Sequence, residues 1–135
     1  MTQVVVPVRY PLSDHSRATL EEGIRIASDE EAALTVLHVN LYQNGKQVTR
    51  SQLKAAVEAE FGKLTNARYS VRKGLLVEQS ILEEIAAEEA DIVVIGKKQV
   101  SRWRQMVRRI TNDPNIEDFL RDHLDCRVVT VSVSG

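Results

Sequence analysis

Cysteine, glycine and proline are scarce in this sequence, and long apolar runs are absent. The single cysteine, Cys126, excludes a disulfide within the chain and fits a reducing compartment. No apolar stretch approaches the ~18 residues of a membrane-spanning helix. The first residues carry neither the charged segment nor the apolar segment of a signal peptide. We therefore expect a cytoplasmic protein that has no membrane span.

Motifs for catalysis, metal binding and phosphate binding are also missing. Neither glycine-rich phosphate motif, GxGxxG or GxxxxGK followed by Ser or Thr, occurs in the chain, and its three histidines show no metal-ligand spacing. The run Ser13-Asp14-His15-Ser16 contains the residue types of a catalytic triad. Consecutive residues at a helix start cannot orient one another, however, so we interpret Ser13 as a helix cap. We interpret His38 as a core histidine, and we expect no metal and no catalytic group.

Size and composition predict one globular domain over residues 1–135. Of the 135 residues, 43% are hydrophobic and 27% are charged, which are ordinary values for a soluble domain. The formal net charge of -1 provides no general attraction to nucleic acid or to a membrane surface. We therefore do not expect nucleic acid as a partner.

Strand-like and helix-like segments alternate along the chain. Runs rich in valine and isoleucine predict strands, and apolar residues at helical spacing predict helices. The predicted strands are 3–8, 34–39, 68–72, 92–95 and 128–133, and the predicted helices are 14–28, 50–64, 77–89 and one beginning at Pro114. This alternation predicts an α/β fold with a mainly parallel sheet and helices on both faces.

The segment from Lys97 to Arg109 contains six basic residues and no acidic one. One interpretation is a surface helix in which Trp103 and Met106 are packed and the arginines are solvated. A second is an anion site, because ligands bind where strands of a parallel sheet end. A third is a patch for nucleic acid or a membrane surface. The sequence leaves these three interpretations open.

Several short patterns follow one another in the order and spacing of a known family. They are Val4-Val5-Val6-Pro7-Val8, His15-Ser16, Leu20, Leu37-His38-Val39, Gly74, Ile81-Leu82, Ala90-Asp91-Ile92-Val93-Val94-Ile95-Gly96, and Cys126 with Val128-Val129. Over nearly the whole chain they resemble the universal stress protein (UspA-like) family. The resemblance implies a Rossmann-like, five-stranded parallel sheet in the order 3-2-1-4-5 and, frequently, a homodimer.

ATP-binding members of that family carry an aspartate after the first strand and a G-x-x-G-x9-G loop, ending in Ser or Thr, after the fourth. Here Arg9 stands at the aspartate position, Gln99 at the second glycine, and Pro114-Asn115 at the end of the loop. Arginine donates hydrogen bonds but accepts none, so it cannot replace an acceptor for ribose or adenine. The lost glycines remove backbone conformations that gather N–H groups around phosphate. We therefore expect no bound cofactor, with ATP or another phosphate-bearing ligand as the disfavoured alternative.

Basic residues nevertheless gather where the first and fourth strands end. Arg9, Lys97 and Lys98 are predicted to converge on one electropositive crevice beside Gly96, with Arg102 as a further candidate. Such a crevice suits a small anion, or the phosphates of a ligand held differently from ATP in the family.

The sequence thus favours a non-enzymatic, universal-stress-like regulator that acts through dimerisation and an unidentified protein partner. The alternative is a nucleotide- or anion-binding stress sensor that uses the crevice. The homodimer is predicted to form through strand 128–133, whose edge lacks charges and prolines beyond Arg127. Val129, Val131 and Val133 are the expected contacts with the partner subunit.

Overall fold

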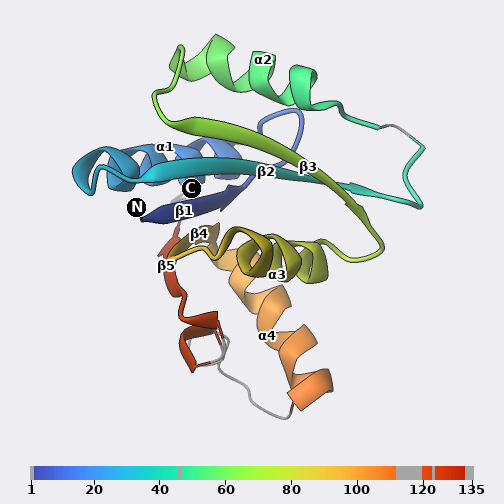
Figure 1. Cartoon of the computed structure of the whole chain (residues 1–135). Coiled ribbons are helices and arrows are strands. Elements are labelled where there is room, and N and C mark those ends of the chain that lie inside the picture. Colours follow the sequence, from blue (N-terminus) through green and yellow to red (C-terminus); the bar gives the residue numbers. More distant parts are fainter. Residues whose placement is uncertain (1, 46, 112–119, 123, 133–135) are drawn as a thin grey trace.

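The computed structural model describes residues 2–45, 47–111, 120–122 and 124–132. Within them, five parallel strands form one sheet in the order β3-β2-β1-β4-β5 (Figure 1). The strands are β1 (Gln3–Pro7), β2 (Ala33–Leu41), β3 (Ala67–Gly74), β4 (Ile92–Gly96) and β5 (Arg127–Val131). The helices are α1 (Asp14–Asp29), α2 (Arg50–Phe61), α3 (Val77–Glu88) and α4 (Lys97–Thr111). The α/β class predicted from the sequence and the strand order implied by the family resemblance are confirmed.

Each face of the sheet is covered by two helices, with α1 and α2 on one side and α3 and α4 on the other (Figure 1). Successive residues of a strand point to opposite faces. Val4 and Val6 of β1 accordingly join the core beneath α1 and α2, whereas Val5 joins the core beneath α3 and α4. This two-sided burial explains why β1 and β4 are almost continuously apolar.

The order in which successive strands are added to the sheet reverses at β1. In parallel sheets a ligand site commonly lies at such a point. From β1 the chain moves outward to β2 and β3, then crosses back to pair β4 with the other side of β1. The loops that leave β1 and β4 therefore diverge to opposite faces. A crevice at the carboxyl ends of these two strands follows from this topology.

Helix starts agree with the predictions more closely than helix ends. Ser13 caps α1 by accepting a hydrogen bond from the Ser16 backbone N–H, and Thr49 forms a capping box with Gln52 at the start of α2. The predicted helix 50–64 is too long, because α2 stops at Gly62, whose φ of 74° leaves the helical region.

Two of the predicted strands extend further than expected. β2 and β3 pair continuously from Leu34 opposite Ala67 to Leu41 opposite Gly74, beyond the predicted ranges 34–39 and 68–72. β3 forms an edge of the sheet, where its polar residues can reach solvent. Backbone pairing with β2 extends β3 through polar residues, which an apolar pattern alone does not assign to a strand.

The basic segment, residues 97–109, lies within helix α4, in agreement with the interpretation of this segment as a surface helix. Trp103 is fully buried and Met106 packs partly against the core beneath α3 and α4, while Lys97, Lys98 and Arg102 are exposed. Most of the helix predicted from Pro114 lies outside the described residues, although Leu120, 0% exposed, belongs to the same core. No described helix is long and apolar enough to cross a membrane.

Candidate functional site

A cavity of about 270 Å³ opens at the carboxyl ends of β1 and β4, between the starts of α1 and α4. Its lining combines apolar residues with basic and polar ones. The lining residues are Pro7, Val8, Arg9, Ser13, His15, Ser16, Thr19, Leu37, His38, Val39, Val77, Ile95, Gly96, Lys98, Gln99 and Arg102. The cavity therefore lies where the reversal of strand order predicts a ligand site.

Four of the five candidate site residues line this cavity: Arg9, Gly96, Lys98 and Arg102. Lys97 does not, so the expected convergence of Arg9, Lys97 and Lys98 is wrong for Lys97. At about 100° per helical residue, Lys98, Gln99 and Arg102 cluster on one side of α4, and Lys97 lies on the other side. Lys98 and Arg102 are four residues apart and share one face of α4.

The loop that carries Arg9 is held against the start of α1. The Arg9 backbone N–H donates to Ser16 Oγ at 2.8 Å, and the Ser13 hydroxyl lies 3.2 Å from the same oxygen. Ser16 is buried, whereas His15 is exposed. The hydroxyls of Ser13 and Ser16 are thus used in capping and loop anchoring, which confirms the interpretation of this run as a helix cap.

His38 borders the cavity through its side chain. Its Nδ1 lies 3.1 Å from the Val8 carbonyl oxygen, and a carbonyl requires that Nδ1 carry the proton. The Tyr10 ring packs against His38 edge-on, with centroids 6.3 Å apart. His38 was expected in the core, but it is half-buried and forms part of the cavity wall.

Gln99 brings an unused hydrogen-bond donor to the cavity wall. Its Nε2 is buried and has no hydrogen-bond partner within the described part of the chain. A buried donor that stays unpaired costs about 1–3 kcal/mol. Because this nitrogen is closed off from solvent, a ligand in the cavity could accept a hydrogen bond from it only if the Gln99 side chain moved. The sequence gives no sign of this feature.

Gly96 does not have the steric role expected of a phosphate-loop glycine. A Cβ added there would lie 3.9 Å from Thr19 Oγ1 and 4.0 Å from the Val131 carbonyl oxygen, both ordinary contacts. Its φ is not in the left-handed region. The backbone at the end of β4 therefore does not require a glycine.

The cavity is electropositive. None of its lining residues is acidic, and among the described residues no ion pair involves Arg9, Lys98 or Arg102. The amino ends of α1 and α4 add partial positive charge at the same edge. This arrangement favours an anionic ligand, and the described residues contain no cluster of three or more His, Cys, Asp or Glu that could hold a metal.

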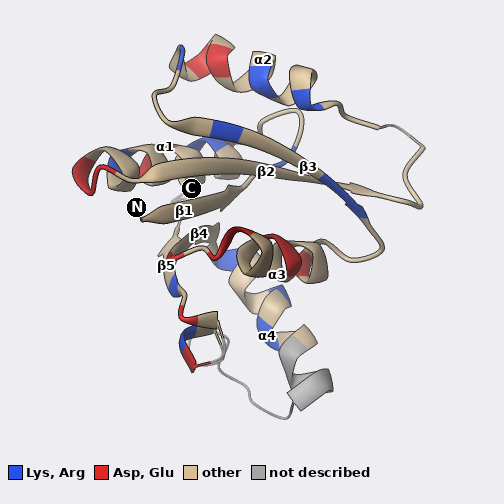
Figure 2. Cartoon of the chain, in the orientation of Figure 1, with Lys and Arg blue, Asp and Glu red and all other residues tan. Residues whose placement is uncertain are grey.

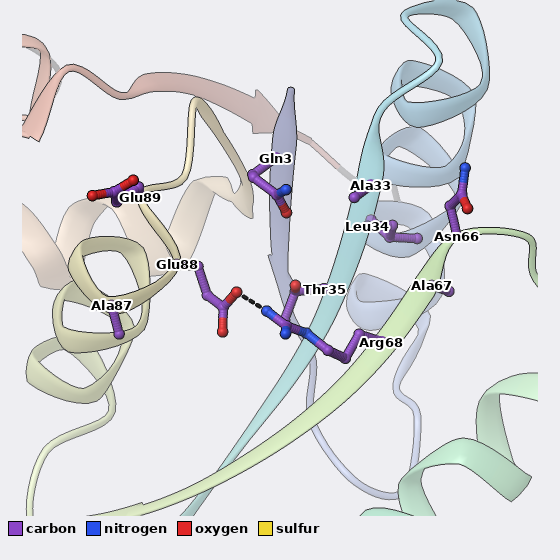
Figure 3. Close-up of a pocket in the computed structure, with 10 residues that line it drawn as sticks. All are labelled: Gln3, Ala33, Leu34, Thr35, Asn66, Ala67, Arg68, Ala87, Glu88 and Glu89. Atoms are coloured by element: carbon purple, nitrogen blue, oxygen red, sulfur yellow. Dashed lines mark ion pairs between the residues drawn. The ribbon is translucent and has the colours of Figure 1, made fainter. Parts of the chain in front are cut away.

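A second cavity, of about 420 Å³, lies at the opposite end of the sheet, beside the carboxyl end of α3 (Figure 3). Arg68 of β3 forms an ion pair with Glu88 of α3 across it. Its arginine is therefore already neutralised, and it lies away from the strand ends that bind ligands in parallel sheets. We therefore regard the first cavity, at the carboxyl ends of β1 and β4, as the candidate site and call it the basic cavity.

Cys126 lies away from the basic cavity and is buried against the core beneath α3 and α4. Burial, and to a smaller extent the carboxylates of Asp91 and Asp125, raises the pKa of its thiol to about 12. The thiol is neutral and inert at physiological pH.

No protein-family model and no curated protein matches this sequence. Several solved structures match over nearly the whole chain. A universal stress protein crystallised in complex with cAMP has a TM-score of 0.59 and 18% identity, over 98% of each chain. UspA from Lactobacillus plantarum has a TM-score of 0.56 and 20% identity, over 96% of this chain and 97% of that one. A protein of the universal stress protein family from Burkholderia pseudomallei has a TM-score of 0.60 and 14% identity, over 96% and 95%.

The chain has the universal stress protein fold. This likeness confirms, at the level of fold, the resemblance drawn from the sequence patterns. The cavity described above lies at the edge of that fold where β1 and β4 end.

Proposed function

We propose that this protein is a non-enzymatic, cytoplasmic stress regulator of the universal stress type. It acts through dimerisation and partner binding, and it does not hold ATP in the way usual for the family. One observation carries the ATP part of the proposal: Arg9 and Gln99 both stand in the wall of the cavity. They occupy the positions at which ATP-binding members have an acceptor and a glycine.

The size of the cavity supports the same conclusion. About 270 Å³ is slightly below the ~300–1,000 Å³ of typical ligand pockets. Arg9 presents only donors, so the ribose hydroxyls and the adenine amino group find no acceptor there. A triphosphate nucleotide would need both more space and a different set of polar groups.

A second candidate function is that of a small-anion sensor. It is favoured by three cations at one cavity, Arg9, Lys98 and Arg102, which form no ion pair within the described part of the chain. One protein of the same fold was crystallised with cAMP, an anionic nucleotide. A compact anion such as inorganic phosphate would fit this charge and volume better than ATP does.

Dimerisation is proposed to occur through β5. In the sheet order β5 is an edge strand, and pairing with a second copy would satisfy its free backbone groups. Val129 and Val131 are half-buried against the core beneath α1 and α2, which leaves part of each valine for a partner subunit. Val133, the third expected contact, lies outside the described residues.

Native mass spectrometry of the purified protein, followed by nucleotide analysis, tests both parts of the proposal. We expect the mass of a dimer that carries no ATP. Any co-purified ligand should be a smaller anion, in support of the second candidate. A monomer that carries one ATP would contradict the proposal.

A further inference from the structure

Three large apolar side chains are exposed at the carboxyl end of the sheet. Tyr42 is 62% exposed, Leu75 69% and Leu76 57%, and they are the most exposed large apolar residues in the described part of the chain. Scattered apolar residues on a surface need no explanation, but a group of them marks an interaction site. We call Tyr42, Leu75 and Leu76 the apolar ledge.

Backbone hydrogen bonds join the two loops that form the apolar ledge. The Tyr42 N–H donates to the Gly74 carbonyl oxygen at 3.0 Å, which continues the pairing of β2 with β3. The Gln43 Nε2 donates to the Leu75 carbonyl oxygen at 3.2 Å. The ledge is therefore held in place before any partner arrives, which lowers the entropy cost of binding.

Leu76 departs from the local rules of helix formation. It is the N-cap of α3, and no side chain provides the cap hydrogen bond. Ser, Thr, Asp or Asn at this position would stabilise the helix by roughly 1 kcal/mol. A residue that breaks a local rule without a packing gain is typical of a functional surface.

The apolar ledge adjoins the basic cavity. Leu76 is followed by Val77, which lines the cavity, and consecutive Cα atoms lie about 3.8 Å apart. Arg9, Lys98 and Arg102 stand around the same opening. One end of the molecule therefore combines an apolar surface with a cationic recess.

Charge is distributed unevenly between the two ends of the sheet. The described loops at the carboxyl end, residues 8–13, 42–45, 47–49 and 75–76, contain no acidic residue, and the first turns of α1 and α3 at this end contain one each, Asp14 and Glu78. Acidic residues gather in the loops at the opposite end, and Figure 2 shows acidic segments where α1 and α3 end. The acidic residues of these loops are Glu30, Glu31, Glu89, Asp91 and, before β5, Asp125. The helix dipoles add to this polarity, because the amino ends of all four helices face the carboxyl end of the sheet.

We propose that this end of the molecule docks an acidic segment of a protein partner. An apolar side chain of that segment packs on the apolar ledge, while a carboxylate enters the basic cavity. The inference rests on the partner binding proposed above and specifies the class of partner. A flat bilayer would cover the ledge but leave the recess unfilled, and nucleic acid has no aliphatic anchor for the ledge. A protein segment supplies both groups at an adjustable spacing.

Fluorescence anisotropy with labelled peptides tests the proposal. The probes carry three glutamates and two leucines, separated by one to five serines, so that the spacing need not be known beforehand. At low salt we expect at least one probe to bind with a dissociation constant at or below about 100 µM. The same peptide with serines in place of its leucines should bind about tenfold more weakly.

Two variants of the protein address the two halves of the surface. Leu75→Ser with Leu76→Ser should weaken binding of the best peptide about tenfold, and Lys98→Glu should weaken it by a similar factor and reduce its salt dependence. Lys63→Glu is the matched control, because Lys63 is exposed and lies in a loop at the acidic end. The Lys63→Glu variant should bind the best peptide as tightly as the unmodified protein does. Thermal unfolding verifies that each variant is folded.

Three results would overturn the proposal. They are the failure of every peptide to bind, equal binding by the Leu75→Ser/Leu76→Ser variant, and binding of phosphatidylserine vesicles through the ledge without binding of any peptide. The last result would assign the ledge to a membrane surface. The ledge substitutions leave β5 and Gln99 unchanged, so native mass and ATP content test the proposed function separately.

Discussion

Arg72 of the edge strand β3 holds the buried carboxylate of Glu84 on α3, with 2.5 Å between Nε and Oε1. Glu84 is only 2% exposed, and its second oxygen has no hydrogen-bond partner among the described residues. Arg72 also lies 3.6 Å from Glu83. This ion pair joins β3 to the helix that begins at the apolar ledge.

Substitutions of Arg72 and of Glu84 should lower the free energy of unfolding by different amounts. Arg72→Ala leaves a buried carboxylate without its countercharge, and we expect a loss of about 3 kcal/mol in the free energy of unfolding. Glu84→Gln removes the buried charge itself and should cost clearly less. Urea denaturation of both variants measures the difference. Equal losses would show that the charge of Glu84 does not matter to the fold.

Gly23 of α1 lies directly against β1. A Cβ at this position would collide with Cγ2 of Val6, which is fully buried. We expect Gly23→Ala to lower the free energy of unfolding by about 1–3 kcal/mol, since a packed core does not accept the extra methyl. Gly45→Ala is the control, because no atom lies within 4 Å of its added Cβ. The melting temperature of the Gly23→Ala variant should fall below that of the Gly45→Ala variant. Similar melting temperatures would refute the close packing of Gly23 against Val6.

The Cys126 thiol should react only when the protein unfolds. Its pKa is raised to about 12 in the folded chain, above the ordinary value of 9.0, so folding favours the protonated form. The resulting stabilisation is complete below pH 9 and is lost as the pH rises toward 12. Labelling with a thiol reagent at pH 8 should be slow in buffer and rapid in denaturant. Rapid labelling of the folded protein would contradict the burial of Cys126.

The proposed β5 interface predicts a dimer that edge substitutions weaken. Thr130 is exposed, so Thr130→Lys places a charge on the strand edge without disturbing the core. Val131→Pro removes a backbone donor from the same strand. Sedimentation should show each variant shifted from dimer toward monomer, with circular dichroism establishing that it is folded. An unmodified protein that sediments as a monomer at tens of micromolar would eliminate the interface.

The order of elements could be predicted from the sequence because the central strands β1 and β4 are apolar on both faces. Valines fill β1, and the burial of Trp103 follows from its spacing with Met106 on α4. The end of α2 could not be predicted, since the helical pattern continues through Leu64 while the backbone leaves the helix at Gly62.

The candidate site was only partly predictable for related reasons. Its basic residues were recognised by charge, but helix phase separates Lys97 from Lys98, which charge alone does not reveal. The apolar ledge was missed because leucines before a helix resemble core residues in a sequence. The Leu76 position is the one local signal, since an N-cap rarely takes a leucine.

Calorimetric titration of the unmodified protein with ATP and magnesium tests most directly whether the cavity has lost the usual ATP site. With Arg9 and Gln99 in its wall, we expect no binding stronger than a dissociation constant of about 100 µM, which corresponds to roughly -5.5 kcal/mol. A dissociation constant in the low micromolar range, near -8 kcal/mol, would contradict this claim.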